Sequence, residues 1–186
     1  MFSPELLHEL IKLPLLPDAV GRRSGRREYG NDSRVYFDRG NLARYPIMRS
    51  AAEALQSQAV VGTICERLSA RLERTFLRIE YALDSDGFWL EPHTDIGVKK
   101  FTCFLYLDGA GDLGTDIYAD AETLSYRLPF IPNTALAFVP GGNTWHGFAP
   151  RPIRGVRRSL IINYVGEEWR ARKQLAFPDM PVAATR

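Results

Sequence analysis

The sequence predicts a mainly β protein, in which an antiparallel β sandwich or barrel is braced by α-helices. Its 186 residues suit one compact domain. Helix and loop patterns occupy residues 1–75, short β-rich runs occupy residues 76–165, and residues 166–186 form a C-terminal tail. Strands this short and numerous argue against a parallel doubly wound sheet, in which strands alternate with helices.

The first helix is expected over residues 4–13. Ser3 is a suitable N-cap, and Pro4 suits the first helical position because the N–H that it lacks has no partner there. The polar, arginine-rich residues 18–33 predict a loop, and the alternating residues 34–38 predict a strand.

A second helical region is expected from residue 46 to about residue 74, where apolar residues follow helical spacing. Gly62 is the position at which we expect this region to break in two. Beyond it, seven β-rich runs are separated by turn-forming segments such as DSDG and PGGN. The runs cover residues 76–83, 87–92, 99–107, 114–119, 123–128, 134–140 and 157–165.

Composition excludes several classes of protein. Hydrophobic residues make up 45% and charged residues 25%, as in ordinary soluble globular proteins. The two cysteines, Cys65 and Cys103, are too few for a disulfide scaffold or a Cys-ligated zinc site. No apolar run approaches the roughly 20 residues of a membrane span, and the N-terminus lacks the basic region of a signal peptide. We therefore expect a cytoplasmic protein without a membrane partner.

The net charge of +2 is unevenly distributed. Residues 20–50 hold eight arginines against three acids, residues 75–148 hold ten acids against four bases, and residues 150–173 hold seven bases against two acids. A nucleic-acid-binding protein is usually basic throughout or along one face. The pattern is typical of a surface of mixed sign, or else the Arg22–Arg27 cluster approaches an anionic substrate.

Two of the three histidines stand in a pattern that suits a metal site. His93 ends one β-rich run, and Asp95 follows two residues later, so both side chains can lie on one face of an extended chain. His146 follows another strand, whereas His8 lies in the first helix, where a solvated role is expected. Two imidazoles and one carboxylate form the facial triad that binds Fe(II) and leaves positions open. A buried structural His–Asp pair is the alternative.

Arg157 begins an otherwise apolar strand, and Ser159, Ile161 and Asn163 share its face. An arginine that points into a β barrel is unfavourable unless it holds an anion, and its planar guanidinium fits a carboxylate. A structural salt bridge is the alternative interpretation.

These residues resemble the HxD…H…RxS pattern of the Fe(II)- and 2-oxoglutarate-dependent dioxygenases, in particular their prolyl-hydroxylase-like branch of small bacterial type. The flanking segments LRIEYALDSDGFWLEPHTD, FLYLDGAGDLGTDIYA and ALAFVPGGNTWHGFAP resemble that branch too. The resemblance covers about residues 76–165. It implies a double-stranded β-helix, which is a cupin-like jelly roll.

The resemblance also implies roles. His93, Asp95 and His146 would be the catalytic ligands of Fe(II), Arg157 would pair with the distal carboxylate of 2-oxoglutarate, and Ser159 would hydrogen-bond it.

Three further residues receive roles from the same resemblance. Tyr106 would contact that carboxylate, Tyr81 would lie near the other end of the cosubstrate, and Asn163 would line the pocket near the metal. For both tyrosines, ordinary core packing is the alternative.

The implied reaction is hydroxylation with O2, with release of succinate and CO2. Asp95 occupies the position that halogenating relatives leave without a carboxylate, which favours hydroxylation, desaturation or demethylation. Nucleic-acid repair is disfavoured, because Asn163 stands where such demethylases carry a second arginine. A small molecule, amino acid or peptidyl side chain is the expected substrate, and the sequence predicts no oligomeric state. Candidate substrate contacts are Arg22–Arg27, Tyr36, Phe88, Trp89, Lys99 and Trp145.

Two other functions fit parts of the pattern. An iron oxidase could use the same triad without 2-oxoglutarate, and Arg157 would then bind another carboxylate. A metal-storing or sugar-binding jelly roll would fit the strands, but it would leave the open triad and the inward arginine unexplained.

Overall fold

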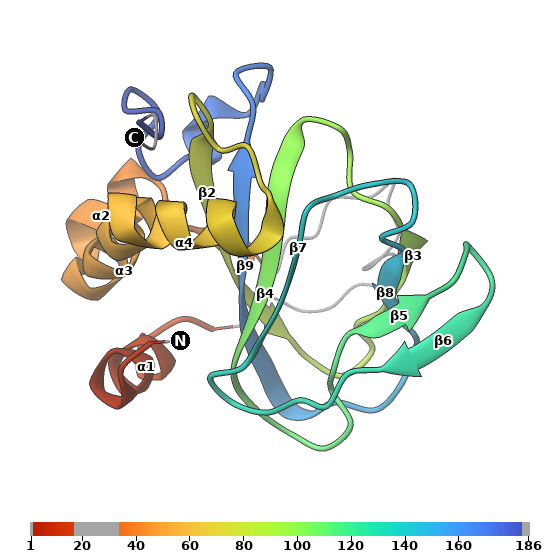
Figure 1. Cartoon of the computed structure of the whole chain (residues 1–186). Coiled ribbons are helices and arrows are strands. Elements are labelled where there is room, and N and C mark those ends of the chain that lie inside the picture. The colour runs from red at the N-terminus through yellow and green to blue at the C-terminus, as the bar shows by residue number, and fades with distance from the viewer. Residues whose placement is uncertain (1, 17–33, 184–186) are drawn as a thin grey trace.

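The computed structural model describes residues 2–16 and 34–183, and the Arg22–Arg27 cluster lies outside them. Two antiparallel sheets form a jelly roll (Figure 1), as the sequence predicts. The five-stranded sheet has the order β1-β2-β9-β4-β7, and the four-stranded sheet has the order β3-β8-β5-β6. The strands are β1 (Arg34–Tyr36), β2 (Phe76–Asp84), β3 (Leu90–His93), β4 (Lys99–Ala110), β5 (Asp116–Tyr118), β6 (Leu124–Arg127), β7 (Ala135–Phe138), β8 (His146–Phe148) and β9 (Arg154–Val165).

Helices cover the outer face of the five-stranded sheet (Figure 1). They are α1 (Pro4–Ile11), α2 (Arg39–Arg44), α3 (Pro46–Gln56) and α4 (Gln58–Leu68), and a short 3-10 helix follows at Arg172–Gln174. Ser3 caps α1 by accepting a hydrogen bond from the Leu6 N–H, as predicted.

Two features of the helical region differ from the prediction. The break between α3 and α4 falls at Ser57 and not at Gly62. Ser57 is extended, and its hydroxyl accepts a hydrogen bond from the Val60 N–H, so it caps the start of α4. Gly62 lies inside α4, where a methyl group would meet nothing within 4 Å. The helix α2 was not predicted.

Strand alternation divides the five-stranded sheet into an apolar face and a polar face. Leu77, Ile79, Tyr81 and Leu83 of β2 belong to the core cluster that packs under the helices. The alternate side chains of β2 point into the space between the two sheets. That interior face carries the polar residues of the candidate site. The burial of the apolar face under the helices stabilises the fold through the hydrophobic effect.

All seven predicted β-rich runs contain a strand of the structure, but β8 was not predicted. It has only three residues, too few to show alternation. The C-terminal tail packs against the sheet, because Leu175 pairs with Arg78 of β2 and both Leu175 and Val182 are buried. No helix in residues 2–16 or 34–183 is long and apolar enough to cross a membrane.

Candidate active site

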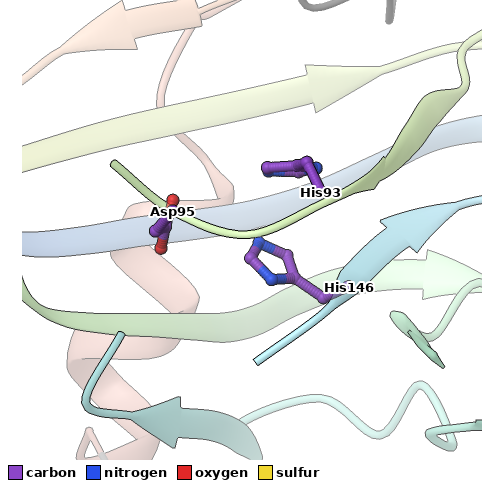
Figure 2. Close-up of side chains that lie close together, drawn as sticks. All are labelled: His93, Asp95 and His146. Carbon is purple, nitrogen blue, oxygen red and sulfur yellow. The ribbon is translucent and has the colours of Figure 1, made fainter. Parts of the chain in front are cut away.

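Two histidines and an aspartate lie close together beside strands β3 and β8 (Figure 2). His93 ends β3, Asp95 follows it, and His146 begins β8. The two strands pair antiparallel with His93 opposite His146, so their ring centroids lie 4.4 Å apart. One ligand atom from each of the three side chains lies within 4.8 Å of the others. The two nitrogens and one carboxylate oxygen form the donor set that suits Fe(II).

Backbone carbonyls orient both imidazoles. His93 Nδ1 lies 2.9 Å from the Glu91 carbonyl oxygen, and His146 Nδ1 lies 2.9 Å from that of Thr144. A carbonyl only accepts, so each Nδ1 carries the proton. The lone pair is then on Nε2, the arrangement usual for histidines that bind metals.

Burial and neighbouring groups set the protonation states of His146 and Asp95. Burial, and after it the charge of the neighbouring His93, lower the pKa of His146 to about 4, so this imidazole is neutral near pH 7. Burial alone would raise the pKa of Asp95. The charge of Lys99 and the hydrogen bonds from Lys99 and Thr102 outweigh burial and hold the pKa below its ordinary value. Both groups are therefore in the protonation state that a metal requires.

A chain of hydrogen bonds fixes the Asp95 carboxylate. Lys99 Nζ donates to Oδ1 at 2.5 Å, and Thr102 Oγ1 donates to Oδ2 at 2.5 Å. Thr102 Oγ1 in turn accepts a hydrogen bond from Asn163 Nδ2 at 2.9 Å. Asn163 thus lies near the candidate metal centre, but it reaches Asp95 only through Thr102.

Arg157 points into the interior, as predicted, but it already has an acidic partner. Its Nη1 donates to Asp84 Oδ2 at 2.5 Å, and its Nε donates to the Leu113 carbonyl at 2.8 Å. The structure therefore contains the salt bridge that was the alternative interpretation of this arginine. Ser159 stands two residues further along the same face, and its buried hydroxyl has no hydrogen-bond partner within the residues that the structure describes.

The Arg157–Asp84 pair is one end of a buried ladder of charges. Arg34 lies between Asp84 and Glu80, at 2.9 and 3.5 Å, and Arg78 pairs with Glu80. Each of the five side chains is at most 10% exposed. Within the described part of the chain, the ladder holds three guanidinium groups and two carboxylates, so one buried positive charge is in excess.

This ladder was not predicted from the sequence, although β2 carries a signal for it. Its charged residues, Arg78, Glu80 and Asp84, stand at alternate positions in an otherwise apolar strand. Such spacing places all three on one face.

The two tyrosines lie on opposite faces of the sheet. Tyr106 faces the interior, where its hydroxyl donates to Thr115 Oγ1 at 2.8 Å, and its ring lies 5.8 Å from the Arg157 guanidinium. Tyr81 faces the helices, and its hydroxyl donates to the Leu10 carbonyl at 3.0 Å. The prediction that Tyr81 lies beside a cosubstrate is wrong, because it stands an odd number of residues from the inward-facing Asp84.

A small cavity and a larger groove adjoin different members of the triad. The cavity measures about 30 Å³ and reaches from His146 to Arg157, and Phe88 lines it. The groove measures about 520 Å³ and is lined by Asp95 together with Lys99.

Of the other candidate substrate contacts, the hydroxyl of Tyr36 accepts a hydrogen bond from Arg78 and so joins the ladder. Trp89 and Trp145 are half-buried and do not line either space.

Comparison with known proteins identifies the fold. No protein-family model matches the chain, and no curated protein matches it by sequence. Among solved structures, a prolyl-4-hydroxylase from Pseudomonas putida aligns with a TM-score of 0.63 and 16% identity, covering 89% of each chain. HygX from Streptomyces hygroscopicus, solved with nickel and 2-oxoglutarate bound, aligns with a TM-score of 0.55 and 13% identity, covering 90% of this chain and 79% of HygX.

A viral collagen prolyl hydroxylase from Paramecium Bursaria Chlorella virus-1, in complex with 2-oxoglutarate, gives a TM-score of 0.55 at 13% identity. The alignment covers 88% of this chain and 91% of the viral protein. The chain therefore has the fold of the 2-oxoglutarate–Fe(II) oxygenases.

Proposed function

We propose that this protein is a non-haem Fe(II) dioxygenase that uses 2-oxoglutarate and O2 to hydroxylate a C–H bond of its substrate. The observation that carries the proposal is the triad of His93, Asp95 and His146, which is held by a fold shared with such oxygenases. One O2 and one 2-oxoglutarate would be consumed for each C–H bond converted to C–OH, with release of succinate and CO2.

The triad fits iron by its donor chemistry. When bound, the metal would supply the activation of dioxygen. The two imidazoles would bind the metal through Nε2, and Asp95 would contribute one negative charge to the centre. Thr102 and Lys99 hold the Asp95 carboxylate in a fixed orientation. Partners of this kind orient the ligands and strengthen metal binding.

Two observations support a dicarboxylate in the interior. The Ser159 hydroxyl is buried without a partner among the described residues, close in the sequence to Arg157 on the same face. The ladder of charges also carries one excess positive charge, and buried charge is unfavourable unless it is paired. One carboxylate of 2-oxoglutarate would offset part of this excess, with Ser159 and an Arg157 shared with Asp84 as its donors.

The groove beside Asp95 supports a small anionic substrate. Among the described residues that line it, three are basic, Arg71, Lys99 and Lys100, and Asp95 is the single acidic one. The groove is lined by Asp95 and the cavity by His146, so a substrate in the groove would adjoin the triad without occupying the cavity at Arg157. A carboxylate or phosphate on a small molecule or peptidyl side chain would suit this positive lining. A long nucleic acid and a membrane remain disfavoured as partners, and the cytoplasmic location stays a prediction.

The proposal is tested by adding 2-oxoglutarate to the Fe(II)-loaded protein without oxygen and following the visible charge-transfer band between iron and the keto acid. We expect a band in the wild type that is absent in His93→Ala and weaker in Arg157→Ala. A folded, iron-loaded wild type without any band would contradict the proposal.

A 2-oxoglutarate-independent iron oxidase is the second candidate. The Asp84–Arg157 salt bridge favours it, because the arginine expected to bind the cosubstrate already has a carboxylate partner. This enzyme would consume O2 with substrate alone, at a rate that added 2-oxoglutarate does not change.

A further inference from the structure

The partner of Arg157 is an aspartate that is entirely buried. Asp84 is 0% exposed, and its two oxygens accept hydrogen bonds from two different guanidinium groups, Oδ1 from Arg34 and Oδ2 from Arg157. Strand register enforces the second contact, because Asp84 of β2 stands directly opposite Arg157 of β9. Asp84 is thus a fixed carboxylate at the place where the distal carboxylate of a cosubstrate is expected.

The space around this pair is small. The cavity from His146 to Arg157 measures about 30 Å³, enough for one or two water molecules. Phe88 and Phe148 line it, with their ring centroids 5.5 Å apart, and the Arg157 guanidinium lies 4.9 Å from the centroid of the Phe148 ring. A five-carbon dicarboxylate can enter only if side chains in this wall move.

Electrostatics opposes a second carboxylate at the same guanidinium. The incoming group would share Arg157 with Asp84, and like charges at hydrogen-bonding range repel strongly in a buried site. The excess charge of the ladder compensates only part of this repulsion, since the other two guanidinium groups also contact Glu80.

We propose that Asp84 acts as an internal competitor for Arg157 and thereby sets cosubstrate selectivity. This inference rests on the proposed function. Because Asp84 already occupies the arginine, the distal carboxylate of 2-oxoglutarate adds little affinity. The wild type therefore accepts 2-oxo acids that lack this carboxylate almost as well as it accepts 2-oxoglutarate.

The test compares two ligands and three proteins. Dissociation constants of 2-oxoglutarate and of 2-oxopentanoate, which carries a methyl group in place of the distal carboxylate, are measured by calorimetry on Fe(II)-loaded protein without oxygen. The wild type should bind 2-oxoglutarate less than about tenfold more tightly than 2-oxopentanoate. A tenfold ratio is the gain in affinity expected from one weak charge-assisted hydrogen bond. Asp84→Asn releases Arg157 from its counter-ion, so its preference should exceed about tenfold through tighter binding of 2-oxoglutarate alone.

Glu80→Gln is the matched control. It removes the same charge from the same face of β2, but Glu80 contacts Arg34 and Arg78 and not Arg157. Its preference should stay that of the wild type.

The outcomes separate a failure of the role proposed for Asp84 from a failure of the proposed function. A wild type that favours 2-oxoglutarate by more than tenfold overturns the role of Asp84, and so does an Asp84→Asn protein with unchanged preference. If Asp84→Asn does not fold, the wild-type ratio alone decides. A wild type that binds Fe(II) but neither 2-oxo acid overturns the proposed function itself.

Discussion

The hydroxyl of Thr102 is the group whose removal tests most directly whether hydrogen bonding orients the Asp95 carboxylate. It is fully buried, and its hydroxyl both donates to Asp95 and accepts from Asn163. Thr102→Val keeps the shape of the side chain and removes only this polar atom. A hydrogen bond to a charged group contributes about 1.5–3 kcal/mol, and an unsatisfied buried donor on Asn163 costs about 1–3 kcal/mol. The added methyl offsets about 0.8 kcal/mol.

We therefore expect Thr102→Val to lower the free energy of unfolding by about 2–5 kcal/mol. Loss of the contact that orients Asp95 should also weaken metal binding by about 10- to 100-fold. Urea unfolding of the metal-free protein measures the first effect, and calorimetric titration with Fe(II) under anaerobic conditions measures the second.

Thr63→Val is the matched control, because Thr63 lies exposed on α4, where its hydroxyl bonds only to the Ala59 carbonyl. It should change stability by less than about 0.5 kcal/mol and leave metal affinity unchanged. The reasoning is refuted if Thr102→Val matches this control in both stability and metal affinity.

Three further predictions follow from burial and packing. Folding lowers the pKa of His146 from 6.5 to about 4. Between these two pH values the unfolded chain carries a proton on His146 that the folded chain lacks, so acid favours unfolding. Acidification from pH 6.5 to 4 should therefore lower the free energy of unfolding by about 3 kcal/mol. Urea unfolding at several pH values should show this loss in the metal-free wild type and a smaller loss in His146→Gln. Tyr81→Phe should lower the free energy of unfolding in urea by about 1 kcal/mol, because the hydrogen bond to the Leu10 carbonyl of α1 is lost. It should leave the affinity for 2-oxoglutarate unchanged, and weaker binding would show that Tyr81 contacts the cosubstrate. Gly114→Ala should prevent folding or cost more than about 3 kcal/mol, because its methyl would lie 1.6 Å from the Leu128 carbonyl oxygen. Gly142→Ala, where nothing lies within 4 Å, should leave the thermal midpoint unchanged, and equal midpoints for the two variants would contradict this packing argument.

The candidate triad could be predicted because its signal is local. His93 and Asp95 are two residues apart at the end of a strand, and residues at that spacing share a face in extended chain. The pattern of turns before His146 indicated another strand end. The short strands predicted an antiparallel sandwich or barrel, and the family resemblance implied a jelly roll; the fold agrees with both.

The Asp84–Arg157 pair could not be predicted in the same way, because it depends on the register of two strands. The two residues are 73 positions apart, and they meet only because β2 and β9 pair with Asp84 opposite Arg157. A slip of one residue would turn every side chain of a strand to the other face. Local patterns show that Arg157 needs an anion, but only the register shows that the chain itself provides one.

The error on Tyr81 has a different physical origin. The motif match placed this tyrosine by its distance along the sequence. The alternation of β2 places Glu80, Ala82 and Asp84 on the interior face and leaves Tyr81 among the apolar residues under the helices. The two-residue period of β2 is by itself enough to exclude Tyr81 from the interior face.

The central claim is that three side chains form one metal site, and the most direct test is the stoichiometry of Fe(II) binding under anaerobic conditions. Calorimetry should show one Fe(II) bound per chain in the wild type and no comparable binding in folded Asp95→Ala or His146→Ala. Equal binding by wild type and variants, or none by the folded wild type, would contradict the account.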